Sequence, residues 1–188
     1  MAVHSFMAPL GSPAPDFTLP RAGGEGEVRL ADLADAPALL VAFLCNHCPY
    51  VQHVESAFGA FTDEYAGRGL ATVGICSNDV ASYPDDDRPH LVAQAKRAGF
   101  SFPYLVDEDQ QVALAYRAAC TPDFYLYEGQ RRLVYRGQFD GSRPGRQAPT
   151  GSSLRAAADL ALAGQPVPEP HHPSVGCGIK WRPGNDPS

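Results

Sequence analysis

The chain has 188 residues, of which 44% are hydrophobic and 19% are charged, so it can bury a core and is not a disordered chain. Its length suits one domain with an elaborated edge. The formal net charge is −6 and Lys and Arg form no run, so we expect no nucleic-acid partner. No apolar run reaches membrane-span length and the N-terminus lacks the pattern of a signal peptide, so we expect a cytoplasmic protein with no membrane partner.

The first half of the chain predicts buried strands joined by an amphipathic helix. Residues 11–20 are Pro-rich and extended, and residues 27–30 form a short strand. Residues 38–44 are apolar on both faces, which is typical of a central strand, and a second buried strand follows over residues 70–75. The helix expected over residues 48–66 has one apolar face, made by Val51, Val54, Phe58, Phe61 and Tyr65.

The second half predicts shorter elements and a Pro-rich tail. In chain order they are an acidic loop over 78–89, a helix over 91–98, a strand over 104–106, a helix over 110–117, a hairpin over 124–127 and 133–135, and a helix capped by Ser152 or Ser153 that runs to about Ala163. A parallel crossover followed by an antiparallel pair predicts an α/β fold with a mixed central sheet flanked by helices on both faces. We predict one domain over residues 1–164 and an irregular tail over residues 165–188 that packs on it.

The cysteines give the strongest chemical signal. The chain has five cysteines, and only Cys45 and Cys48 are closely paired in sequence. In a reducing compartment, an odd number with one close pair indicates catalysis or metal binding rather than a disulfide framework. A tetrahedral zinc site would need two more ligands, and no second pair has matching spacing, so we predict neither a metal nor another cofactor.

The Cys45-Asn46-His47-Cys48 turn lies between the predicted central strand and the long helix. Free backbone N–H groups and the positive end of the helix dipole favour a thiolate there. His47 adds a group that can be cationic near neutral pH. We therefore expect the pKa of Cys45 to be lowered, with Cys45 as the nucleophile and Cys48 as the resolving thiol of a thiol–disulfide oxidoreductase.

Five segments resemble the thioredoxin-like redoxin family, which includes thiol-specific antioxidant and alkyl hydroperoxide reductase-type proteins. They read GSPAPDFTL over 11–19, FLCNHCP over 43–49, CTPDF over 120–124, YRGQFD over 135–140 and GCGIKW over 176–181. The last three segments look like those of a bacterial subgroup usually described only as "thioredoxin family protein". The resemblance covers most of the chain and implies a thioredoxin-like fold with an N-terminal extension.

The resemblance also implies roles for two further residues. Pro122 would be the cis-proline that packs against the C-x-x-C turn in this fold, and Thr121 before it would pair with the substrate chain. The implied partners are protein or small-molecule disulfides, with peroxides as a second substrate class, and a thiol reductant such as thioredoxin.

A peroxidase is the main alternative, since peroxiredoxins use a Pro-x-x-x-Thr-x-x-Cys motif on the same helix. Cys48 would then be peroxidatic, but Cys45 and Val41 replace the threonine and the proline. The arginine that helps polarise the peroxide is also missing, since Thr121-Pro122 stands near its expected position. Arg117, Arg136 or Arg143 could replace it only if folding brings one of them near Cys48. Disulfide exchange is therefore favoured. The third reading is a non-enzymatic redox sensor or copper handler.

The remaining cysteines are accessory candidates. Cys120 fits a small buried packing residue better than a catalytic one, and Cys76 fits the core. Cys177 is either an extra resolving thiol or part of a tail anchor with Trp181, and the anchor is favoured.

Other polar residues are expected to have ordinary roles. Asp123 fits a polar cap at a strand start better than a proton-transfer group. Solvated surface positions are expected for the remaining acidic and histidine residues of interest, namely Asp79, Asp85, Asp86, Asp87, His4, His90, His171 and His172.

Overall fold

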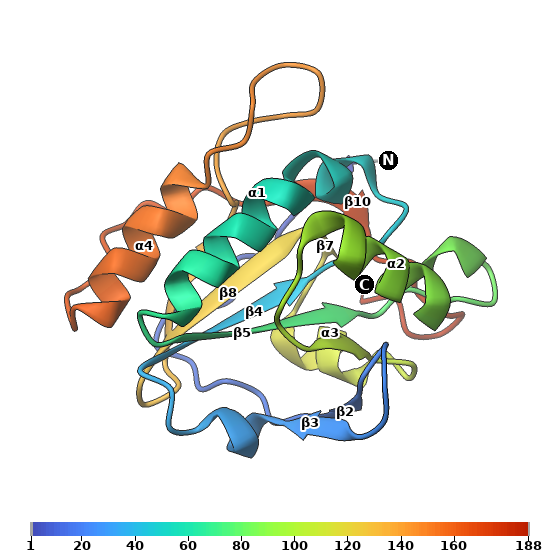
Figure 1. Ribbon diagram of the computed structural model, residues 1–188, viewed down its shortest axis with the longest axis horizontal. Coiled ribbons are helices and arrows are strands. Elements are labelled where there is room, and N and C mark those ends of the chain that lie inside the picture. Colours follow the sequence, from blue (N-terminus) through green and yellow to red (C-terminus); the bar gives the residue numbers. More distant parts are fainter. Residues whose placement is uncertain (1, 188) are drawn as a thin grey trace.

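The computed structural model describes residues 2–187 and has a five-stranded mixed sheet at its centre (Figure 1). The sheet order is β6-β5-β4-β8-β9, with bounds Tyr104–Val106, Leu70–Cys76, Ala38–Phe43, Asp123–Glu128 and Leu133–Gly137. β4 runs parallel to β5 and antiparallel to β8. All six residues of β4 are buried, as expected for an apolar strand covered on both faces.

Helices cover both faces of this sheet. One face packs against α1 (Pro49–Ala66), α2 (Arg88–Ala98) and α4 (Ser152–Leu162). The other face packs against α3 (Gln111–Tyr116) and the hairpin of β2 (Thr18–Pro20) and β3 (Glu27–Arg29). The predicted α/β class and the mixed sheet are confirmed, and α1 begins directly after the cysteine turn that the sequence places there.

The tail differs from the prediction, because part of it is a strand. β10 (Val175–Gly178) pairs antiparallel with β1 (Ala2–His4) on one side and with β7 (Cys120–Thr121) on the other. An edge strand such as β7 leaves backbone N–H and C=O groups unpaired, and the tail satisfies them. The expectation of an irregular tail is wrong for these four residues.

The starts of two helices differ from the predictions. The N-cap of α4 is Gly151 in the left-handed region, with φ 70°, and neither Ser152 nor Ser153 caps the helix. A side chain at Gly151 would run into the ring of Phe139, so only glycine fits this close approach. α2 begins at Arg88, earlier than expected, because the Asp87 carboxylate accepts a hydrogen bond from the backbone N–H of His90.

Three residues expected on the surface are buried instead: Asp79, Asp86 and His171. Asp86 closes the short 3₁₀ helix η2 (Pro84–Asp86), which folds the acidic loop back onto the cysteine turn. His171 receives a 2.9 Å hydrogen bond at Nδ1 from the guanidinium of Arg136. Within residues 2–187, no helix combines the length and the apolar character needed to cross a bilayer.

Candidate active site

The two cysteines of the turn face each other. Cys45 follows the last residue of β4 by two positions, and Cys48 is the N-cap of α1, with Pro49 as the first helical residue. Both side chains are buried as free thiols, and each cysteine shifts the pKa of the other. The strand-to-helix turn thus brings together the pair that the sequence singled out.

Thr121 lies against both sulfurs. Its hydroxyl oxygen is 3.2 Å from Cys45 Sγ, and its carbonyl oxygen is 3.2 Å from Cys48 Sγ. The Thr121–Pro122 peptide bond is cis, which confirms that prediction. The predicted docking residues therefore lie beside the cysteines, although they are 73 or more positions away in the chain.

Cys48 carries the negative charge of the reduced pair. The hydrogen bond from the Cys45 thiol is the largest of the effects that lower the pKa of Cys48 to about 5. Burial opposes this shift, and the Cys177 thiol and the backbone N–H groups of Val51 and Cys177 add to it. Val51 supplies a free N–H of the first helical turn, the group that N-caps normally bind.

Cys45 keeps the shared proton, contrary to the expectation that its pKa would be lowered. Its hydrogen bond with Cys48 raises the pKa of Cys45 well above the ordinary value, and burial and the nearby Asp86 carboxylate raise it further. The two shifts describe one proton held between two sulfurs, so they belong to the pair. The helix terminus does stabilise a thiolate, but at Cys48.

His47 is bound to Asp86 rather than to a sulfur. The ring Nδ1 lies 2.6 Å from Asp86 Oδ2, and the ring stacks on Tyr83 with a centroid distance of 5.5 Å. The expected effect of His47 on the pKa of Cys45 is therefore not found. The charged side chain that contributes to the pKa of Cys45 is Asp86, and it raises that pKa.

Asp86 is the functional residue that sequence reasoning missed. Its carboxylate is fully buried and accepts hydrogen bonds from Asn46 N–H, His47 N–H, His47 Nδ1 and Asn78 Nδ2. Buried carboxylates need such donors. Nothing local separates Asp86 from its acidic neighbours, because its partners lie up to 40 positions away.

A metal ion does not fit this cluster well. Donor atoms of Cys45, His47 and Asp86 lie within 4.8 Å of one another. Each carboxylate oxygen of Asp86 already accepts two hydrogen bonds. If Asp86 bound a metal ion through Oδ2, it would lose its hydrogen bond with His47. The prediction that no metal binds here stays a prediction, with these contacts in its favour.

A buried amide supports the turn from α2. Gln94 donates from Nε2 to the backbone carbonyl of Cys45 at 3.0 Å, and its Oε1 accepts from Tyr104 OH at 3.0 Å. Glu55 on α1 binds both Gln94 and Arg97. These contacts fix the backbone of Cys45, and no sequence motif pointed to them.

The other cysteines have separate environments. Cys120 is buried and its thiol donates to the carbonyl of Pro122 at 3.8 Å, which is a packing contact. Burial also raises the pKa of both Cys120 and Cys76. Cys177 on β10 is a half-buried free thiol, and its pKa is raised by burial and by the neighbouring Cys48.

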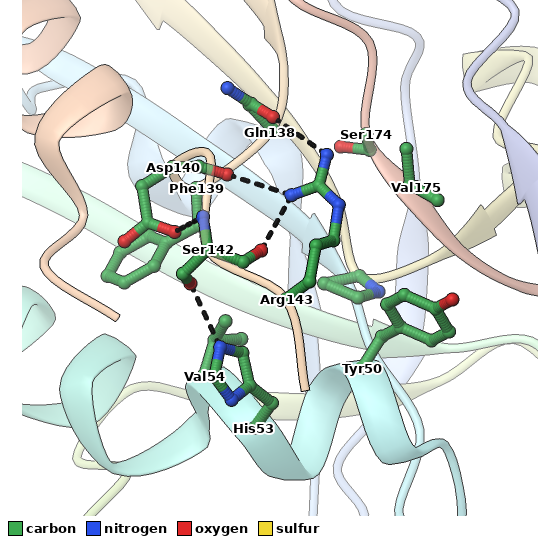
Figure 2. A pocket seen from close by; sticks show the side chains of 11 residues that line it. Tyr50, His53, Val54, Gln138, Phe139, Asp140, Ser142, Arg143, Ser174 and Val175 are labelled. Carbon is green, nitrogen blue, oxygen red and sulfur yellow. Dashed lines mark hydrogen bonds between the residues drawn. The ribbon is translucent and has the colours of Figure 1, made fainter. Parts of the chain in front are cut away.

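A pocket lined by Pro122 contains Arg143, one of the three candidate arginines (Figure 2). The guanidinium of Arg143 donates to Gln138 Oε1 and to the carbonyls of Asp140 and Ser142. Arg136 binds the carbonyl of Ala8 and His171 instead, and Arg117 lines a pocket with Phe6. Within residues 2–187, no arginine hydrogen-bonds to either cysteine sulfur.

Comparisons with known proteins bear on the family and the fold. The model of the AhpC/TSA family matches residues 10–139, and no curated protein matches. A hypothetical protein from Sinorhizobium meliloti 1021 is 49% identical with a TM-score of 0.93, covering 96% of this chain and 99% of that chain. An uncharacterized conserved protein from Geobacillus kaustophilus is 47% identical with a TM-score of 0.94, covering 97% of each chain.

More distant structures show the fold alone. A thiol:disulfide interchange protein DsbE from Chlorobium tepidum is 19% identical with a TM-score of 0.65, covering 82% of this chain and 98% of that chain. The peroxidoxin BcpB from Mycobacterium tuberculosis is 20% identical with a TM-score of 0.57, covering 82% and 94%. Both have the thioredoxin-like α/β fold that the sheet order and helices display here.

Proposed function

Because this chain belongs to the AhpC/TSA family, we propose that it is a thiol–disulfide oxidoreductase whose working pair is Cys45 and Cys48. The observation that carries the proposal is the placement of two buried free thiols at the start of α1, with each sulfur 3.2 Å from an oxygen of Thr121. Two thiols of a C-x-x-C turn that lie this close to the same residue can be converted to a disulfide.

The expected division of roles is reversed in this proposal. Cys48 holds the thiolate, so it attacks one sulfur of a substrate disulfide, whose S–S bond breaks and releases one thiolate. Cys45 then loses its proton and attacks Cys48 Sγ, which releases the second substrate thiol. The substrate gains two electrons and the Cys45–Cys48 pair loses them. A thiol reductant of the thioredoxin kind would restore the dithiol.

Single substitutions test the proposal and the order of roles. Reduction of insulin disulfides with dithiothreitol as the electron source is measured for Cys45→Ser and Cys48→Ser, with Cys76→Ala as the control. We expect Cys48→Ser to be inactive and Cys45→Ser to accumulate mixed disulfides. If Cys48→Ser accumulates the mixed disulfides instead, Cys45 is the attacking thiol, as the sequence predicted. Full activity of both variants would refute the proposal.

Peroxide reduction is the second candidate, favoured by the low pKa of Cys48 at the position that corresponds to a peroxidatic cysteine. Among the described residues 2–187, no arginine is bound to this sulfur, where it would stabilise the departing oxygen. Consumption of hydrogen peroxide with a thiol donor distinguishes it. Rapid consumption that survives Cys45→Ser would place peroxidase activity ahead of disulfide exchange.

A further inference from the structure

We infer that Cys177 is a third redox thiol of this site, which forms a disulfide with Cys48 and so fastens the tail strand β10 across the cysteine turn. The inference rests on the proposed function, because it needs Cys48 to react first. Two placements carry it. Cys177 packs against the cluster that contains Cys48, and β10 is paired with β7 so that Cys177 lies opposite Thr121.

The strand register places Cys177 at the reactive pair. Cys177 pairs with Thr121 of β7, whose hydroxyl and carbonyl oxygens each lie 3.2 Å from one of the sulfurs of Cys45 and Cys48. Cys177 also packs against the buried cluster that contains Cys48. Figure 1 shows β10 beside β7, near the end of α1 where the helix begins.

Close packing holds β10 in this position. A Cβ on Gly176 would overlap the carbonyl oxygen of Thr121, so the residue before Cys177 allows an approach that only glycine permits. Upstream, Ser174 donates from its hydroxyl to the carbonyl of Gly137 at 2.6 Å. Downstream, the Lys180 N–H donates to Asn78 Oδ1 at 2.8 Å. Cys177 is thus fixed on both sides and is not a cysteine of a loose tail.

The same contacts connect the tail to the turn through side chains. Asn78 receives the Lys180 N–H and donates from Nδ2 to Asp86, which in turn binds His47. The tail and the cysteine turn therefore share one buried hydrogen-bond network. A simple anchor would need β10 and Trp181, but it would not need a thiol directed at Cys48.

The chemistry balances with a disulfide as the oxidant. Cys48 thiolate attacks a disulfide R–S–S–R, giving a Cys48–S–S–R bond and one R–S⁻. The Cys177 thiol then gives up its proton to solvent and attacks Cys48 Sγ, which releases the second R–S⁻. The oxidant gains two electrons, and Cys48 and Cys177 lose one each as their S–S bond forms.

The protonation of Cys177 supports this sequence. Burial and the hydrogen bond to Cys48 raise the pKa of Cys177 to about 11, so it rests as a thiol that donates to the Cys48 thiolate. Once Cys48 is bonded to a substrate sulfur, its charge is gone. The Lys180 ammonium, which lowers the pKa of Cys177, remains.

The test uses the full chain carrying Cys45→Ser, so that Cys48 is the only cysteine of the turn. The protein is treated with oxidised glutathione, quenched with N-ethylmaleimide and digested with trypsin without reduction. Cys48 lies in the tryptic peptide 30–68 and Cys177 in the peptide 156–180, so a cross-link between them is unambiguous. We expect this linked pair, with glutathione released on the order of 100-fold faster than in Cys45→Ser/Cys177→Ser.

Each other outcome decides the matter. Cys48 bearing glutathione while Cys177 is alkylated overturns the inference but leaves the proposed function in place. Cys48 without glutathione and without a link overturns the inference and also the assignment of Cys48 as the attacking thiol, whereas the insulin assay still decides whether Cys45 and Cys48 are the working pair. Cys45→Ser/Cys120→Ser serves as the matched control, because the Cys120 thiol donates to Pro122, and it should form the link as fully as Cys45→Ser.

Discussion

The two ends of the Cys45–Cys48 turn differ in the charges around them. At the Cys48 end, N–H groups from the first turn of α1 and from β10 lower the pKa of the thiol, although the sulfur also lies 3.2 Å from the Thr121 carbonyl oxygen. The Cys45 end has the Asp86 carboxylate nearby, and its backbone carbonyl is held by Gln94. Two residues of the same type, three positions apart, therefore have opposite pKa shifts. The difference teaches that the partners of a C-x-x-C turn, and not its spacing, decide which sulfur is ionised.

The largest effect should follow from removing the ionised sulfur. Cys48→Ser should lower the rate of insulin disulfide reduction on the order of 1,000-fold or more, since it removes the attacking atom. In the wild type, alkylation of Cys48 by iodoacetamide should rise with pH around 5, because the pKa of Cys48 is lowered to about 5. Alkylation of Cys48 that rises only near pH 9 would contradict the proposed difference in pKa between Cys48 and Cys45.

Asp123, which follows Pro122 in the chain, should make the stability of the protein depend on pH. Burial raises the pKa of Asp123 from 3.8 to about 6. Between these values the folded state keeps a proton that the unfolded chain has lost. The free energy of unfolding should therefore fall as the pH rises through this window, by about 3 kcal/mol in total. Urea denaturation of wild type and Asp123→Asn from pH 3.5 to 7 checks this, since the variant should lack the decrease.

Removing the carboxylate at the Cys45 end should sharpen the comparison. Asp86→Asn should cost about 2 kcal/mol in the free energy of unfolding, because the amide cannot accept all the hydrogen bonds that the carboxylate accepts. It should also lower the pKa of Cys45, since the Asp86 charge raises it. Urea denaturation measures the first effect and the pH dependence of Cys45 alkylation measures the second. Asp85→Asn, whose side chain is exposed, is the matched control.

The smallest effect is expected at Thr121. Thr121→Val keeps the backbone carbonyl near Cys48 but removes the hydroxyl near Cys45. We expect a loss of about 1 kcal/mol in stability and a few-fold slower insulin reduction. Thr121→Ser keeps the hydroxyl and should behave like the wild type in both assays. An equal loss in Thr121→Ser would assign the effect to packing.

The core of the fold follows from local patterns in the sequence. The apolar run of β4 and the periodic face of α1 each specify their element without outside information, because burial of these side chains is the main driving force. The two elements then fix the place of Cys45 and Cys48. Most of the fold and the position of the two cysteines are therefore predictable from the sequence.

The rest of the site depends on partners that are distant in the sequence. Asp86 resembles its exposed neighbours until η2 turns it towards Asn46 and His47. β10 reads Val-Gly-Cys-Gly, and glycine is depleted in strands, so its strand structure depends on pairing with β7 and β1. A single sequence carries no information on which polar groups are satisfied by each other across 40 or more positions.

The antiparallel pairing of β1 with β10 has a practical consequence for handling this protein. Ala2 lies opposite Cys177, so a fusion partner or an affinity tag joined ahead of β1 would emerge next to the sulfurs. A polyhistidine sequence there would bring imidazoles, and any nickel they carry, close to three thiols. Samples intended for redox titration are better prepared with a cleavable tag that leaves few additional residues.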